Sequence, residues 1–209
     1  RAKDEYAGFQ GKCYVTSGGY DFALRSPDAD DYVEALELAN SDNEEERNEA
    51  NETLAQFVKD TEWLQQFLDK TSESIYSLKD YENYVDVDSF IDFYLVQEFF
   101  KNVDVGSTSQ FYVIDQTDEV VKLKAGPVWD FDIACGIVDS SRGNYYAYEY
   151  NDLWMRERDY YCKALFEDPA FHEKVSERYA EIREDVVLSV FDENLLFVKA
   201  IIFTLAFFG

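Results

Sequence analysis

A segment that is apolar on nearly every side gives the strongest constraint on the fold of this chain. Residues 89–100 read Ser-Phe-Ile-Asp-Phe-Tyr-Leu-Val-Gln-Glu-Phe-Phe. The first four have the form of a capping box that begins at Ser89, which predicts a helix start there. A helix with apolar side chains on almost all faces has to be surrounded by other elements. We therefore expect residues 89–100 to form the central helix of the core.

Two short β-prone runs follow this helix, at residues 110–114 and 120–125, with polar residues between them. This arrangement predicts a strand, a turn and a returning strand. A hairpin brings the chain back close to where it started. We therefore expect Asp104, which precedes the hairpin, to lie near Asp130, which follows it.

These aspartates, together with Asp132, form a candidate metal site. Asp130 and Asp132 end the motif Gly-Pro-Val-Trp-Asp-Phe-Asp at residues 126–132. Hard cations such as Mg²⁺ prefer oxygen ligands, and phosphoryl transfer needs one carboxylate on the metal and another near the attacking hydroxyl. The alternative for Asp104 and Asp130 is an ordinary turn or capping acid. We expect Trp129 and Phe131 to be core residues that orient the acids.

The rest of the pattern is mainly helical. A hairpin is predicted over residues 13–24, a long helical region over 30–78, and two further helices near 153–166 and 169–186. In the last of these, Asp168 as N-cap and proline at the first helical position indicate the start. We expect an α+β fold that is mainly helical, with small hairpins.

The charge of the chain restricts its partners. The formal net charge of the 209 residues is -25. Such a field repels phosphate backbones, which argues against nucleic acid and favours a basic protein as partner. The run 195–208 is almost wholly apolar but shorter than the roughly 20 residues that a membrane span requires. We expect a buried terminal helix and no membrane span.

Cysteine and histidine chemistry has little support. Cys13, Cys135 and Cys162 contain no C-x-x-C pair, and with the lone His172 they lack the close ligand pairs of structural zinc sites. A single histidine also argues against Ser-His and Cys-His nucleophilic mechanisms. The redox state of the three cysteines stays open.

Several motifs, taken in order, resemble the CotH kinase family, which is known from bacterial spore coats and secreted proteins. The main ones are DSFIDFYLVQE at 88–98, KNVD at 101–104, Phe-Tyr at 111–112 and GPVWDFD at 126–132. RSPD at 25–28 and LFEDPAF at 165–171 are similar as well. The resemblance covers about residues 20 to 185.

The resemblance implies an atypical protein kinase with a kinase-like catalytic lobe, which transfers the γ-phosphate of ATP to protein serine with Mg²⁺ or Mn²⁺. Asp104 would then lie near the acceptor hydroxyl, and Asp130 would bind the metal with Asp132 as second ligand. Asn102 and Ser109 become candidates for the nucleotide and metal site. Ser109 stands where the general kinase pattern has asparagine, and Asn102 has an alternative role as a helix C-terminal residue. A spore-coat, extracellular or cell-surface location is implied too.

We expect one CotH-like domain over residues 1–209, with a hairpin segment 1–28, a helical core 29–186 and an apolar helix 187–209. The cation that the family is expected to place on the nucleotide phosphates has no clear counterpart near the start, since Arg25 is the only nearby basic residue in a strand-like setting. We therefore expect the chain to be a fragment without the amino-terminal part. Its activity, acceptor protein and oligomeric state stay open.

Two other functions remain as alternatives. A non-catalytic carbohydrate-binding or protein-binding module would use the aromatic residues Tyr145, Tyr146, Tyr148, Tyr150 and Trp154 as a platform. A glycosidase would need two carboxyl groups roughly 5 to 10 Å apart across a sugar cleft. The kinase interpretation differs from both because it accounts for the order of the motifs.

Overall fold

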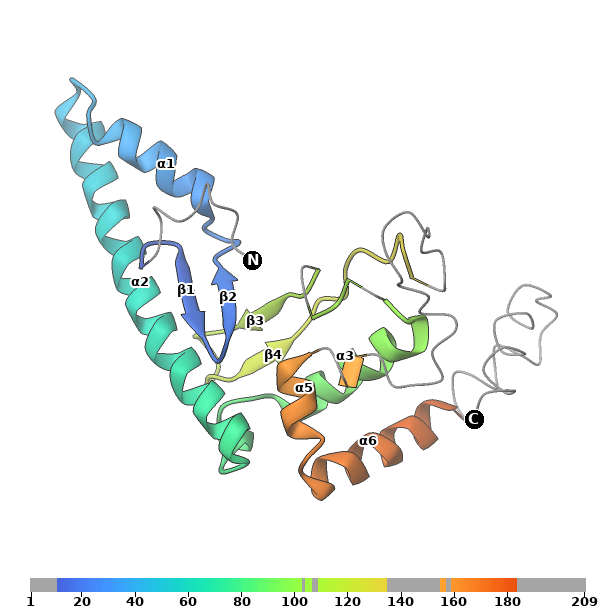
Figure 1. Ribbon diagram of the computed structural model, residues 1–209. Helices are drawn as coiled ribbons and strands as arrows, with labels where there is room; N and C mark the ends of the chain where they lie inside the picture. Colours follow the sequence, from blue (N-terminus) through green and yellow to red (C-terminus); the bar gives the residue numbers. More distant parts are fainter. Residues whose placement is uncertain (1–10, 103, 107–108, 135–154, 157–158, 184–209) are drawn as a thin grey trace. The chain divides into compact units, whose positions relative to one another are not determined.

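The computed structural model describes residues 11–102, 104–106, 109–134, 155–156 and 159–183 (Figure 1). The chain divides into two compact units, Arg1–Ser77 and Leu78–Gly209. Helices and two antiparallel two-stranded sheets confirm the α+β class expected from the sequence. The single domain over residues 1–209 stays a prediction, and the terminal helix expected at 187–209 lies outside the described residues.

The first unit contains a hairpin and two helices. Its elements are β1 (Tyr14–Ser17), β2 (Tyr20–Ala23), α1 (Ala29–Leu38) and α2 (Glu44–Ser77). The turn of the hairpin is Gly18-Gly19, with φ of 59° and 89°. These left-handed values suit glycine because a Cβ atom is disfavoured there. The predicted hairpin is confirmed, and the helical region expected over 30–78 forms two helices.

A small apolar cluster holds the first unit together. Cys13, Tyr32 and Phe57 form its buried part, with Leu24, Ala29 and Leu54 packed against it. The rings of Tyr32 and Phe57 meet edge to face with centroids 5.3 Å apart. This cluster joins α1 to α2 beside the start of the hairpin.

The second unit is built around α3, with the second hairpin and two later helices. Its elements are the short 3₁₀ helix η2 (Tyr81–Asn83), α3 (Val87–Phe100), β3 (Tyr112–Ile114), β4 (Leu123–Ala125), α5 (Tyr160–Leu165) and α6 (Pro169–Ile182). β3 and β4 pair antiparallel, as the sequence predicts, with Tyr112 opposite Ala125. α3 contacts both β4 and α6.

The start of α3 differs from the prediction. Asp86 is the N-cap, and its side chain accepts a hydrogen bond from the backbone N–H of Ser89 at 3.0 Å. The Ser89 hydroxyl instead donates to the Asp86 carbonyl at 2.7 Å and accepts from the N–H of Ala125 at 3.1 Å. Ser89 as N-cap is therefore wrong, because this side chain ties the first turn of the helix to β4.

The burial of α3 confirms that it is the central helix of this unit. Phe90, Ile91, Phe93 and Tyr94 are each at most 4% exposed. The Tyr94 ring meets that of Phe166, between α5 and α6, with centroids 4.7 Å apart. Such burial is the main favourable contribution to folding.

Helix α6 begins as the sequence predicts. Asp168 is its N-cap, and proline occupies the first position of the helix. The Asp168 carboxylate accepts hydrogen bonds from Ala170 N–H at 2.9 Å and from the Tyr81 hydroxyl at 2.6 Å. This contact fixes the start of α6 against the 3₁₀ helix that precedes α3.

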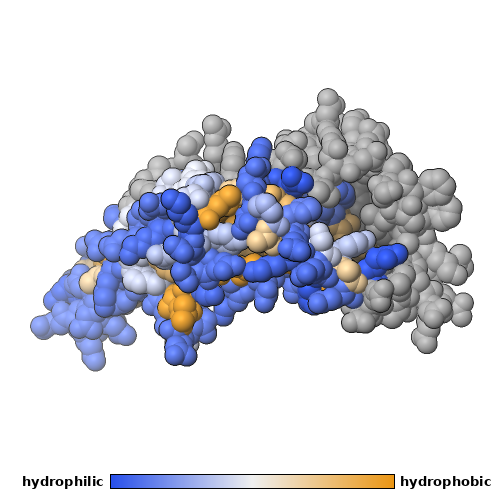
Figure 2. Space-filling model, turned by 90° about the horizontal axis from the view of Figure 1, so that it is seen from below, coloured by the Kyte–Doolittle hydropathy of each residue, from blue (hydrophilic) through white to orange (hydrophobic). Residues whose placement is uncertain are grey.

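Hydrophilic residues dominate the face of the molecule in Figure 2, where apolar residues form only small separate patches. Among the described residues, no helix combines the length and apolar character that crossing a membrane requires.

Cys13 and Cys162 are free thiols, both buried, while Cys135 lies outside the described residues. Burial raises the pKa of the Cys162 thiol well above its usual value, which argues against a nucleophilic role.

Candidate functional site

The candidate site lies where the chain leaves α3. Lys101 is the C-cap and adopts a left-handed conformation with φ of 49°. Its ammonium group pairs with the carboxylate of Glu98, whose other oxygen accepts a hydrogen bond from the N–H of Met155 at 2.8 Å. The end of the helix is thus fixed from two sides, and the chain turns into the loop that carries Asp104.

The second segment of the site follows β4. The N–H of Gly126 donates to the carbonyl of Phe111 at 2.9 Å, which extends the pairing of the hairpin by one step. Residues 127–130 then run along the surface, all of them exposed. Asp130 has a left-handed backbone with φ of 60°, a conformation that is uncommon for a residue other than glycine.

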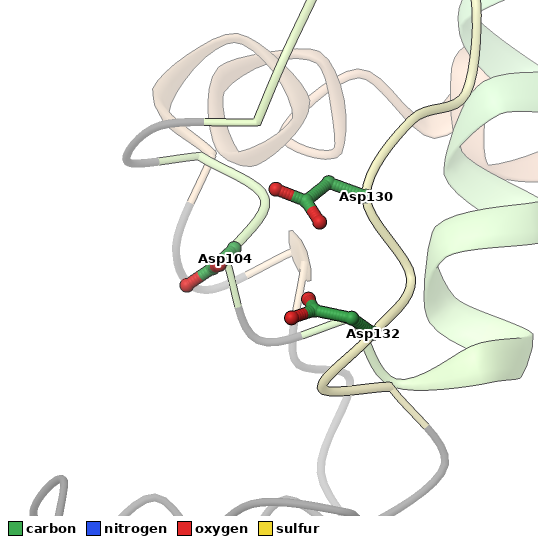
Figure 3. Close-up of side chains that lie close together, drawn as sticks. All are labelled: Asp104, Asp130 and Asp132. Carbon is green, nitrogen blue, oxygen red and sulfur yellow. The ribbon is translucent and has the colours of Figure 1, made fainter.

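Asp104, Asp130 and Asp132 meet at this point. One carboxylate oxygen from each of the three lies within 4.8 Å of the others. Figure 3 shows Asp130 and Asp132 extending from one segment toward the loop that carries Asp104. Asp104 is half-buried, whereas the other two are exposed. The proximity of Asp104 and Asp130 that the hairpin predicts is confirmed.

Asn102 lies between the two segments. It is fully buried. Its amide nitrogen donates to the carbonyl oxygens of Trp129 and Asp130, at 3.4 and 3.2 Å, and its amide oxygen accepts from the N–H of Asp104 at 3.2 Å. All three contacts are to backbone atoms, so the side chain connects the two segments that carry the acids.

Ser109 lies beside Asp130. Its hydroxyl donates to a carboxylate oxygen of Asp130 at 3.2 Å. The next residue, Gln110, donates to the buried carboxylate of Asp159 at 2.5 Å, and Asp159 caps α5 through the N–H of Cys162. The residue that follows Ser109 is thus bonded to the N-cap of α5, which restrains the loop that carries Ser109.

Glu98 and Asp159 were missed as candidates by the sequence analysis. Each is a carboxylate with little exposure, 9% and 0% respectively, and each accepts a hydrogen bond that fixes a neighbouring segment. Only Glu98 had a detectable signal, because a charged residue in an otherwise apolar helix needs a partner when it is buried.

The two aromatic residues of the acidic motif have different surroundings. Trp129 is 60% exposed, so the expectation that it belongs to the core is wrong. Its ring meets that of Phe111 edge to face with centroids 6.1 Å apart. Phe131 is half-buried and packs against the ring of Phe100 at 5.6 Å. The exposure of Trp129 follows from the surface path of residues 127–130.

The chemistry of this donor set suits a divalent cation. In the part of the chain that the structure describes, no lysine or arginine pairs with Asp130 or Asp132. Three neighbouring carboxylates repel one another when all are ionised. A hard divalent cation removes that repulsion and accepts carboxylate oxygens as ligands. The residues present therefore fit Mg²⁺ or Mn²⁺.

Comparison with known proteins identifies a protein family. The model of a protein family described as CotH kinase protein matches residues 11–193. This range contains all the residues of the candidate site. No curated protein and no solved structure matches the chain.

Proposed function

Because this chain belongs to the CotH kinase family, we propose that it is a protein kinase that transfers the γ-phosphate of ATP to serine. The observation that carries the proposal is the convergence of Asp104, Asp130 and Asp132 from two separate segments. A kinase-like lobe has the same order of parts: a helix, a loop aspartate, a hairpin and a metal-binding aspartate.

In this proposal the acids have distinct roles. Asp130 and Asp132 hold a divalent cation, which when bound offsets the negative charge of the nucleotide phosphates. Ser109 supports Asp130 through its hydroxyl. The half-buried position of Asp104 on the opposite segment suits a group that orients the acceptor hydroxyl and accepts its proton.

The transfer exchanges one bond at phosphorus for another. The serine oxygen forms a bond to the γ-phosphorus while the bond from that phosphorus to the bridging oxygen breaks, and ADP leaves. The proton of the serine hydroxyl passes to the carboxylate of Asp104. Such catalysis depends mainly on positioning and charge stabilisation, and the fixed end of α3 supports the position of the loop that carries Asp104.

The charge of the chain suggests the class of acceptor. With a net charge of -25, the protein attracts Lys/Arg-rich segments at low ionic strength, and salt screens that attraction. We propose basic proteins of the spore coat or of the bacterial cell surface as acceptors, in keeping with the family.

The test is transfer of radiolabel from γ-labelled ATP to a serine peptide rich in lysine and arginine, with Mg²⁺ or Mn²⁺. The protein is assayed as this chain and as a form extended at its amino terminus. We expect transfer by the extended form, loss of transfer in Asp130→Asn, and retention in the matched variant Asp21→Asn, which changes an exposed carboxylate of the first hairpin. Transfer that persists in Asp130→Asn would contradict the proposal.

One observation favours a second candidate. Trp129 is 60% exposed beside the acids, and exposed aromatic rings are common in binding sites. A non-catalytic module that binds carbohydrate or protein would use this ring with a structural cation. This second candidate predicts ligand binding without nucleotide and no phosphoryl transfer by any form of the protein. The same radiolabel assay therefore distinguishes it from the kinase.

A further inference from the structure

One buried side chain makes contacts to both acid-bearing segments of the site. Asn102 is 0% exposed, and its amide bonds to the N–H of Asp104 on one side and to the carbonyls of Trp129 and Asp130 on the other. A buried amide that satisfies both its donor and its acceptor has a fixed orientation. It can therefore transmit the position of one segment to the other.

The segment that carries Asp130 has few other restraints. The last backbone hydrogen bond of the hairpin region is that of Gly126 to Phe111. Within the described residues, no backbone-to-backbone hydrogen bond holds residues 127–130, and Asp130 has the strained φ of 60°. The two carbonyls that Asn102 contacts lie in this segment, one of them belonging to Asp130 itself.

We propose that Asn102 is a positioning residue whose side-chain amide fixes the loop of Asp104 relative to the segment of Asp130 and Asp132, the two carboxylates that hold the divalent cation. This role rests on the proposed function for the identity of the bound group. In this proposal Asn102 is not a ligand of the cation, because its side chain is fully buried and all of its contacts are to backbone atoms.

Two substitutions distinguish positioning from direct ligation. Asn102→Asp is nearly isosteric and adds a negative charge close to the cation. If Asn102 were a ligand, a carboxylate in its place would strengthen cation binding. If it positions the acids, the new carboxylate faces the carbonyl oxygens of Trp129 and Asp130, the donor is lost, and binding weakens. Asn102→Ala removes both donor and acceptor without added charge.

The experiment is calorimetric titration of the chain with Mn²⁺ in the absence of nucleotide. We expect both Asn102 variants to bind Mn²⁺ about 10- to 100-fold more weakly than the parent, as is typical when a group that supports a metal ligand is lost. Asn51→Ala is the matched control, because this asparagine makes an exposed amide contact within α2. Its affinity should equal that of the parent.

A second measurement does not depend on the folding of the variants. By NMR, the side-chain amide protons of Asn102 in the parent should exchange slowly with solvent, both before and after saturation with Mg²⁺. Fast exchange before Mg²⁺ is added would overturn the positioning role, and so would loss of protection when Mg²⁺ binds.

The titration also separates the positioning role from the proposed function. Parent-like affinity in both Asn102 variants, or tighter binding by Asn102→Asp, would overturn the positioning role and leave the proposed function in place. Absence of Mn²⁺ binding by the parent chain would overturn the metal site, and with it both the proposed function and the role of Asn102.

Discussion

The two hairpins of this chain have similar sequence signals and very different surroundings. β1–β2 turns through two glycines, and its turn end is bonded to α2: Ser17 donates to Asp69 at 2.8 Å, Gln65 to the Thr16 carbonyl at 2.9 Å, and Tyr76 to the Gly18 carbonyl at 2.6 Å. These contacts attach the turn end of the hairpin to α2 within the first unit.

The second hairpin is shorter, and it contacts α3 through β4 and the Tyr161 ring of α5 through Tyr112. β3 and β4 share three residue pairs. Leu123 is buried and its backbone bonds to Tyr84 and Asp86, just before α3, and the ring centroid of Tyr112 lies 5.9 Å from that of Phe90 in α3. The chain that enters and leaves this hairpin carries the acids. The first hairpin thus stabilises the first unit through its bonds to α2. The second hairpin instead brings together the loop that carries Asp104 and the segment that carries Asp130 and Asp132.

Substitution of the acids that flank the second hairpin should have the largest effect, on phosphoryl transfer and on Mg²⁺ binding. Asp130→Asn should reduce phosphoryl transfer about 100-fold or more, because a charged group that acts on the reacting centre is lost. It should weaken Mg²⁺ binding more than Asp104→Asn does, since Asp130 is assigned as a metal ligand and Asp104 is not. Calorimetric titration of both variants checks this, and equal affinities would remove the assignment of roles.

Substitution of a buried side chain in each hairpin should have the next largest effect, on the free energy of unfolding. Leu123→Ala should lower the free energy of unfolding by about 2–5 kcal/mol, because a buried leucine leaves a cavity, and it should also weaken Mg²⁺ binding. Leu123 is 1% exposed, as is Val15 in the first hairpin. Val15→Ala should destabilise the chain less and leave Mg²⁺ affinity unchanged. Chemical denaturation and titration measure the two effects, and a loss of Mg²⁺ affinity in Val15→Ala would break the comparison.

The turn of the first hairpin gives a smaller effect. A Cβ atom at Gly18 would lie 2.5 Å from the Ser72 hydroxyl oxygen, whereas at Gly19 nothing lies within 4 Å. Gly18→Ala should cost about 1–3 kcal/mol through clash and backbone strain, and Gly19→Ala about 1 kcal/mol through strain alone. Thermal unfolding of the two variants measures the difference. Equal losses of stability in the two variants would mean that the turn does not pack closely against α2 at Gly18.

The smallest effect concerns α6, the other element that packs on α3. The Tyr81 hydroxyl, with the N–H of Ala170, lowers the pKa of the Asp168 carboxyl, and burial together with Asp168 raises the pKa of Tyr81. Tyr81→Phe should therefore cost about 1 kcal/mol at pH 7. A lowered carboxyl pKa stabilises the fold above the unfolded value of about 3.9, and this contribution is lost as the pH falls through the folded value.

The pH dependence of that variant follows from both groups. The raised pKa of Tyr81 keeps the hydroxyl protonated, so its contribution is complete below the unfolded value of about 10 and is lost only at higher pH. Urea denaturation should show a constant difference between parent and Tyr81→Phe from about pH 5 to pH 9, which shrinks below about pH 4. A difference that grows in acid would contradict the assigned contact.

The parts of the fold that the sequence predicted are those with local causes. Gly18-Gly19 favours a tight turn, the apolar sides of α3 require burial, and a hairpin brings its flanking residues together, so the order of elements alone was enough to pair Asp104 with Asp130. The predicted start of α3 at Ser89 was wrong. Asp86 is the N-cap, and Ser89 bonds instead to β4, a partner that no local pattern reveals.

The supporting contacts of the site could not be predicted. Asn102 bonds to residues 27 and 28 positions away, and Glu98 to Met155 at a separation of 57. Such contacts depend on how the segments pack, which a helical or alternating pattern does not specify. The same holds for Trp129, whose exposure depends on the path of the chain beyond β4.

The exposed indole of Trp129 gives the candidate site its own optical probe. It is adjacent in sequence to Asp130 and 60% exposed, so we expect the emission of this residue to change when a cation binds at the acids. In the first unit, Trp63 is stacked on Phe67 with centroids 5.2 Å apart and provides an internal reference. Occupancy of the site can thus be followed by fluorescence in the unlabelled protein, with Trp129→Phe to identify the source of the signal.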